Sequence, residues 1–89
     1  MANILVCDDD REIVDAIEIY LAQENFNVIK AYDGIEALEA LKTNDIQLLI
    51  IDIMMPRLDG IHAILKIRET SSIPIIILSA KTEDPDKIL

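Results

Sequence analysis

The sequence predicts an α/β domain in which helices cover both faces of a doubly wound parallel sheet. Two unbroken apolar runs, 4–7 and 48–51, lack the alternation of a half-exposed strand and are typical of strands buried on both sides. Both runs end abruptly in acid, the first at the aspartate triplet 8–10 and the second at Asp52. Predicted strands and helices alternate along the chain, which indicates right-handed crossovers and parallel strand pairing.

The first strand, 4–7, is followed by an amphipathic helix and a second strand. Apolar residues recur at helical spacing over 11–23, while charged residues fall on the other faces. Tyr20 belongs to the apolar positions of this pattern. Asn25 ends the helix, and the mixed segment 26–31 is typical of a half-exposed edge strand.

Two acids predict the start of the second helix. Asp33 and Glu36 lie three residues apart, the spacing at which both side chains can accept backbone N–H groups at a helix start. The helix extends to about Lys42. Turn residues 43–45 then separate it from the buried strand that ends at Asp52.

The second half of the chain contains a loop, a helix, a strand and the start of another helix. Within the loop 54–60, Asp59 can cap a helix that covers about 60–69, and the glycine at position 60 relieves the backbone. An isoleucine-rich run predicts a fourth strand over 75–78. A further helix begins within the last segment, 84–89.

Composition restricts the classes of function. A chain of 89 residues is one domain, 1–89, and 52% hydrophobic with 28% charged residues is globular. The net charge of -9 argues against nucleic acid as a direct partner of this segment. No signal-length apolar segment opens the chain, and Cys7, its single cysteine, excludes an internal disulfide. We expect a cytoplasmic protein that does not enter a membrane.

The acids at the strand ends form the candidate site. If the strands 4–7 and 48–51 are neighbours, Asp8, Asp9 and Asp52 meet on one rim of the sheet, where doubly wound folds bind their ligands. A hard divalent cation with oxygen ligands would relieve their mutual repulsion, which predicts Mg²⁺ and phosphate chemistry. The alternative is a set of helix caps and solvated turn acids.

Other chemically active side chains receive structural interpretations. Asp10 is interpreted as a helix cap. Cys7 is interpreted as a small core residue, and His62 as a surface residue of its helix. The side chains of Met54 and Met55 are interpreted as loop packing.

Three separated motifs resemble the receiver domain of two-component response regulators, closest to the OmpR-like transcriptional branch. They are the acid pair 8–9, the segment 52–60 (DIMMPRLDG) and the segment 79–81 (SAK), and they match in order and spacing across the chain. The resemblance implies a flavodoxin-like (CheY-like) sheet with the order 2-1-3-4, in which the first and third strands are adjacent.

The resemblance implies a role for each matching residue. Asp52 is expected to accept a phosphoryl group from a phosphohistidine on a sensor histidine kinase. Asp9 and Asp52 are expected to bind Mg²⁺ directly, with the backbone carbonyl of Met54 as a third protein ligand and Asp8 acting mainly through water. Ser79 is expected to contact the phosphoryl oxygens. Such a domain is a signalling phosphoacceptor and not an enzyme, because it catalyses only its own phosphorylation and dephosphorylation.

The sequence departs from the family at its carboxyl end. The resemblance implies a truncated receiver that lacks the fifth strand and helix, the effector domain and the lysine that pairs with the phosphoryl group. Lys81 follows Ser79 too closely to be that lysine. An uncovered edge on the strand 75–78 would favour a homodimer or a larger assembly through that edge.

Two other functions are alternatives to the phosphoacceptor. Haloacid dehalogenase-like phosphatases also attack phosphate with a strand-end aspartate beside Mg²⁺, but they place a second acid two residues later, where this chain has Met54. The stronger rival is an inert receiver remnant that folds and self-associates without accepting phosphate. The missing lysine favours this rival, whereas Asp8, Asp9 and Asp52 oppose it.

Overall fold

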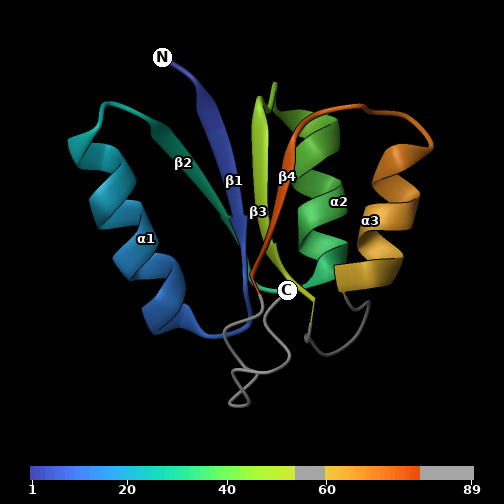
Figure 1. Cartoon of the computed structure of the whole chain (residues 1–89), viewed down its shortest axis with the longest axis horizontal. Coiled ribbons are helices and arrows are strands. Elements are labelled where there is room, and N and C mark those ends of the chain that lie inside the picture. Colours follow the sequence, from blue (N-terminus) through green and yellow to red (C-terminus); the bar gives the residue numbers. More distant parts are fainter. Residues whose placement is uncertain (54–59, 79–89) are drawn as a thin grey trace.

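Four parallel strands form a single sheet with the order β2-β1-β3-β4 in the computed structural model, which describes residues 1–53 and 60–78. Helix α1 covers one face of the sheet, and α2 and α3 cover the other (Figure 1). The predicted fold class and strand order are therefore confirmed. The elements are β1 (Asn3–Cys7), α1 (Arg11–Gln23), β2 (Asn27–Ala31), α2 (Gly34–Thr43), β3 (Leu48–Asp52), α3 (Gly60–Arg68) and β4 (Ile75–Leu78).

The two central strands contribute side chains to an apolar core on each face. Leu5 and Leu49 belong to the core beneath α2 and α3, whereas Val6 and Ile50 belong to the core beneath α1. Since neighbouring residues of a strand point to opposite faces, burial on both faces explains why these runs show no polar alternation. The pairing of Cys7 with Ile51 sets the register, so β1 and β3 end side by side.

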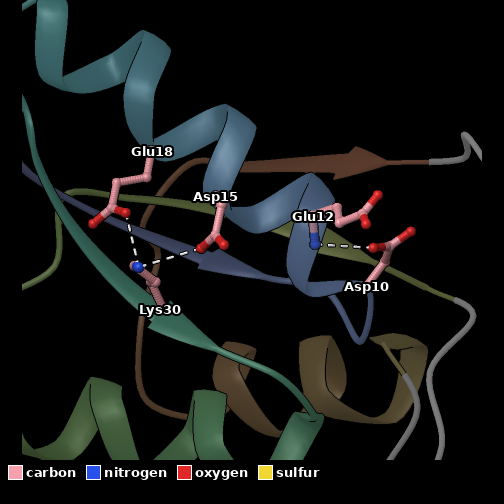
Figure 2. Close-up of polar contacts among 5 residues, drawn as sticks. All are labelled: Asp10, Glu12, Asp15, Glu18 and Lys30. Atoms are coloured by element: carbon pink, nitrogen blue, oxygen red, sulfur yellow. Dashed lines mark hydrogen bonds and ion pairs between the residues drawn. The ribbon is translucent and has the colours of Figure 1, made fainter.

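Two of the three predicted helix caps, Asp10 and Asp33, are present, and the second differs in one detail. Asp10 accepts a hydrogen bond from the amide of Glu12 at the start of α1 (Figure 2). Asp33 accepts from the amide of Glu36 at 2.8 Å at the start of α2. The carboxylate of Glu36 returns to the amide of Tyr32, one residue before the cap, at 2.9 Å. The reciprocal pattern thus satisfies two free amides where β2 passes into α2.

One lysine connects β2 to α1. The Nζ atom of Lys30 lies 2.8 Å from Glu18 and 3.4 Å from Asp15, one turn apart on the helix (Figure 2). The hydrogen bond to Glu18 is the main cause that raises the pKa of Lys30 above its ordinary value. This pair of contacts fixes α1 against the edge strand of the sheet.

Several large apolar side chains remain exposed within the described part of the chain. Tyr20, which the helical spacing placed with the apolar positions of α1, is 67% exposed. Ile76 and Ile77 of β4 are 50% and 52% exposed and point to opposite faces of the sheet. Within residues 1–53 and 60–78, β4 pairs only with β3, so it forms an edge of the sheet. None of the described helices has the length and apolar character needed to cross a bilayer.

Candidate metal centre

The three acids predicted to meet do so at the carboxyl ends of β1 and β3. Carboxylate oxygens of Asp8, Asp9 and Asp52 all lie within 4.8 Å of one another. Asp8 and Asp52 are only 2% and 1% exposed, whereas Asp9 is exposed to solvent. The strand register accounts for this convergence, because the pair Cys7 and Ile51 immediately precedes Asp8 and Asp52.

Backbone hydrogen bonds orient Asp8 inside the cluster. Its amide donates to the carbonyl of Ala31 at 3.2 Å and so continues the contact of β1 with β2 beyond the strand end. Its Oδ1 atom accepts from the amide of Asp10 at 2.9 Å. The side chain of Asp8 is therefore held in the turn between β1 and α1, where it points to the same rim as Asp52.

The donor set fits Mg²⁺. Magnesium binds oxygen at about 2.1 Å, so two oxygens on opposite sides of one ion lie about 4.2 Å apart. A cluster within 4.8 Å needs only small side-chain rotations to reach that separation. The exposed Asp9 leaves the site open to water and to a substrate, and Mg²⁺ in proteins usually keeps several such ligands. A divalent cation would also offset two carboxylates that are buried next to each other.

The fold adds positive potential at this rim. Each helix follows a strand, so the amino-terminal ends of α1, α2 and α3 lie at the carboxyl edge of the sheet (Figure 1). The free amides and the helix dipole favour negative charge at these ends. The rim can therefore accept an anion such as a phosphoryl group once a cation has neutralised the acids.

Cys7 lies behind the acids but is not suited to bind the metal. Burial is the main cause that raises the pKa of its thiol to about 12, and the negative charges of Asp33 and Asp8 act in the same direction. Its Sγ atom donates a hydrogen bond to the carbonyl of Asp33 at 3.3 Å. A thiol in this state is a structural contact between β1 and the start of α2, as the sequence predicted for a core residue.

Gly60 lies directly behind Asp52. A β-carbon built on Gly60 would overlap the carbonyl oxygen of Asp52 and the α-carbon of Ile53. The absence of a side chain thus allows the first turn of α3 to contact the main chain at the end of β3. The sequence indicated backbone relief at this glycine but gave no signal for its contact with Asp52.

The remaining predicted site residues lie outside the described part of the chain. The backbone carbonyl of Met54 and the hydroxyl of Ser79 belong to residues 54–59 and 79–89, as do Met55, Asp59, Lys81 and the predicted helix start at 84. His62 is exposed, as predicted, and Asp10 is a helix cap. The described site therefore consists of the three converging aspartates with Cys7 and Gly60 behind them.

Comparison with known sequences identifies related chains. The family model of the response regulator receiver domain matches residues 4–88. The chain is 44% identical to the response regulator GtcR of Aneurinibacillus migulanus over 87 residues. The aligned region covers 98% of this chain and 36% of that relative. It is 45% identical to the regulatory protein VanR of Enterococcus faecium over 86 residues, which are 97% of this chain and 37% of VanR. It is 42% identical to the transcriptional regulatory protein CpxR of Escherichia coli K12 over 89 residues, which are 100% of this chain and 38% of CpxR.

Solved structures give the same result at the level of the fold. The receiver domain of the Francisella response regulator 1452 superposes with a TM-score of 0.85 at 37% identity, covering 99% of this chain and 74% of that one. The response regulator TrrA of Thermotoga maritima, crystallised in complex with Mg²⁺-BeF, gives a TM-score of 0.85 at 30% identity, covering 99% and 77%. The chain thus spans 36% to 38% of the three curated relatives and about three quarters of these two solved structures.

Proposed function

Because this chain belongs to the response regulator receiver domain family, we propose that it accepts a phosphoryl group on Asp52 from a sensor histidine kinase in two-component signal transduction. The observation that supports this proposal most directly is the convergence of the Asp8, Asp9 and Asp52 carboxylates within 4.8 Å. Helix caps and turn acids have no reason to bring three carboxylates together against their own repulsion.

Asp8, Asp9 and Asp52 would hold Mg²⁺, with the backbone carbonyl of Met54 as a further ligand. When bound, the ion neutralises charge on the phosphoryl oxygens. Asp9 and Asp52 would contact it directly and Asp8 mainly through water. Ser79 would hydrogen-bond the transferred group.

The chemistry of the transfer requires little beyond position and charge. A carboxylate oxygen of Asp52 forms the new O–P bond while the N–P bond to the kinase histidine breaks, and the bonding electrons return to the imidazole. The register of β3 and the contact of Gly60 with the Asp52 main chain hold this nucleophile in place. The product is a mixed anhydride, which water can hydrolyse to end the signal. The domain acts on itself, so we propose a signalling role and not an independent enzyme.

The biological setting extends this proposal. Relatives such as CpxR and VanR are named as regulators, and CpxR as a transcriptional one. We therefore propose that this chain takes part in the regulation of transcription in the cytoplasm. The net charge of -9 suggests that any contact with DNA is made by another segment.

Beryllofluoride tests the phosphoacceptor directly. With Mg²⁺ present, we expect a ¹⁹F signal of bound beryllofluoride and large amide shifts near Asp52. The variant Asp52→Asn should lose the signal. The matched control Asp10→Asn removes one charge beside the site but keeps a good helix cap, so it should retain the signal. Absence of binding to the unchanged chain at saturating reagent would instead favour the inert remnant.

Self-association is a second, separate part of the proposal. Ile76 and Ile77 are exposed on β4, which is an edge of the sheet within residues 1–53 and 60–78, and such an edge invites strand pairing with another copy. We propose a homodimer or a larger assembly through this edge. Light scattering that finds a monomer at micromolar concentration would reject the assembly and would leave the role of Asp52 unaffected.

A further inference from the structure

A pocket lies at the opposite end of the sheet from the aspartates. It has a volume of about 580 Å³ and is lined by the carboxyl-terminal parts of α2 and α3 and by the segments that enter β3 and β4. Figure 1 shows these helix ends side by side, near the amino ends of the strands. Pockets of about 300 to 1,000 Å³ are the size at which proteins bind small molecules.

The pocket has an apolar floor. Ile46 and Ile67, both of which line it, are almost fully buried in the core, and Ile73 and Leu41 also line it. These side chains offer a surface for an aliphatic or aromatic ligand body. Such a floor would bind the apolar part of a ligand whatever charge the ligand carries. The polar residues around the floor therefore decide which ligand charge is preferred.

Three of the cations in the described part of the chain contact other groups of the protein. Of the five Lys and Arg side chains in the described residues, Lys30 pairs with Asp15 and Glu18, Arg11 lies over the ring of Tyr32 at 3.9 Å, and Arg68 donates to the carbonyls of Ser71 and Ile73.

The other two described cations, Lys42 and Lys66, have no ion pair or hydrogen bond within the described part of the chain. Both line this one pocket. The chain carries only 8 basic residues against 17 acidic ones, so two unpaired lysines in one pocket are a local enrichment.

Other groups already bond several of the free carbonyls at both helix ends. At the end of α2, the carbonyl of Ala40 accepts from the amide and the side chain of Asn44, and the carbonyl of Glu39 accepts from Thr43. At the end of α3, the amide of Glu69 donates to the carbonyl of Lys66, and the amides of Thr70 and Ser71 donate to the carbonyl of Ile67. Both ammonium groups are therefore available to a ligand.

We propose that this pocket binds a small amphiphilic anion, with an apolar body on Ile46, Ile67 and Ile73 and a carboxylate or a similar acid between Lys42 and Lys66. Asp45 and Glu69 also line the pocket and oppose the anion; they are as exposed as the two lysines, and no ion pair joins them to Lys42 or Lys66 within the described residues. This inference does not depend on the role of Asp52.

Three eight-carbon probes that differ in charge test the proposal. Octanoate, 1-octanol and octylamine are titrated into the ¹⁵N-labelled full chain, and amide shifts of Ile46, Ile67 and Ile73 report the pocket. We expect octanoate to bind at least tenfold more tightly than octanol, and octylamine to bind more weakly than either. Octanol or octylamine binding as tightly as octanoate overturns the proposal.

A second apolar groove serves as an internal reference. It is lined by Ile17 and Leu21 of α1 and by Ile76 of β4. Shifts by octanoate that concentrate at these residues, and not at Ile46, Ile67 and Ile73, would mean ordinary apolar adsorption and would also overturn the proposal.

Charge variants identify the groups that hold the anion. Lys42→Met and Lys66→Met should each reduce the preference for octanoate over octanol at least threefold, and the double variant should abolish it. Lys30→Met makes the same change outside the pocket and should keep the preference. Asp45→Asn and Glu69→Gln should strengthen octanoate binding. Unchanged octanol affinity shows that a variant still folds, and an unchanged octanoate preference in the double lysine variant rejects the assignment.

Discussion

Gly60 contacts the main chain of Asp52 so closely that a β-carbon at position 60 would overlap the Asp52 carbonyl oxygen. The start of α3 and the candidate phosphoacceptor therefore cannot move independently. Because α3 begins immediately behind the end of β3, the backbone of the site is part of the packing between a helix and the sheet.

This contact predicts that Gly60→Ala destabilises the protein. In an unconstrained helix the change would stabilise by about 1 kcal/mol, because alanine is the better helix former. Here the overlap with backbone atoms should cost about 1 to 3 kcal/mol, so the sign of the effect is reversed. Urea unfolding measures the stability, and a Mg²⁺ titration should show weaker binding.

A change in the same turn of α3 separates this effect from helix stability. Ile61 is exposed, so Ile61→Ala should change neither stability nor Mg²⁺ binding appreciably. If Gly60→Ala proved as stable as the unchanged chain with normal Mg²⁺ affinity, the proposed restraint on Asp52 would be wrong.

The aspartate cluster should cost stability when no metal is bound. Asp8→Asn removes one buried negative charge, while the amide oxygen can still accept from the backbone of Asp10. We expect a higher melting temperature without Mg²⁺, since about 1 kcal/mol corresponds to about 4 to 8 °C in a domain of this size. The stabilisation by added Mg²⁺ should shrink, because a ligand stabilises only the state that it binds.

Glu39→Gln is a suitable comparison for that experiment. Glu39 is an exposed acid of α2 and belongs to no part of the cluster. Its loss should leave the response to Mg²⁺ intact. Equal Mg²⁺ stabilisation of Asp8→Asn and the unchanged chain would remove Asp8 from the metal centre.

Local sequence signals were sufficient for the individual strands and helices but not for the order of the strands. Unbroken apolar runs are buried on both faces in β1 and β3, and the predicted bounds of α1 agree with the structure. The adjacency of Asp8 and Asp52 came from the family resemblance, because a strand order depends on crossovers that no short pattern specifies.

Packing between distant segments was beyond the reach of the sequence. Three such features join separate elements: the contact of Gly60 with Asp52, the hydrogen bond of Cys7 to Asp33, and the presence of Lys42 and Lys66 in the lining of one pocket. Tyr20 shows the same limit differently. Helical spacing gives the direction of a side chain but not whether a neighbouring element covers it, and Tyr20 remains largely exposed.

Cys7 should be chemically inert in the folded state. Its thiol is fully buried, and its pKa is raised to about 12 from an ordinary value of 9.0, so almost no thiolate forms at pH 8. We expect iodoacetamide to alkylate the native chain at least about 100-fold more slowly than the urea-unfolded chain. Similar rates would show that the thiol is accessible.

The raised pKa of Cys7 also sets a pH dependence of stability. The folded state holds the thiol proton more tightly than the unfolded state, so this contribution is complete below pH 9.0 and is lost as the pH rises toward about 12. Stability should therefore decline above pH 9 more steeply in the unchanged chain than in Cys7→Ala. Parallel curves for the two chains would contradict this assignment.

Lys30 should contribute to stability in a salt-dependent way. Its contacts with Asp15 and Glu18 lie at the surface, where salt screens ion pairs. Lys30→Met should lower the melting temperature slightly at low ionic strength, and the difference should diminish in 1 M NaCl, a concentration at which the screening length falls to about 3 Å. A difference that persists in high salt would indicate packing by the lysine stem instead.

Asn25 offers a stabilising substitution that the fold itself suggests. Its φ of 67° lies in the left-handed region, which glycine adopts without strain, and its amide donates to the carbonyl of Ala22 at the end of α1. Asn25→Gly should preserve this turn and raise the free energy of unfolding by a few tenths of a kcal/mol up to about 1, whereas Asn25→Ala should lower it by about 1.

Asn27→Gly makes the same change inside β2 and should destabilise, because glycine weakens a strand. Urea unfolding of the three variants gives opposite signs for glycine at two positions that are two residues apart. Destabilisation by glycine at both positions would mean that the Asn25 side chain, and not its backbone conformation, makes the main contribution at that turn.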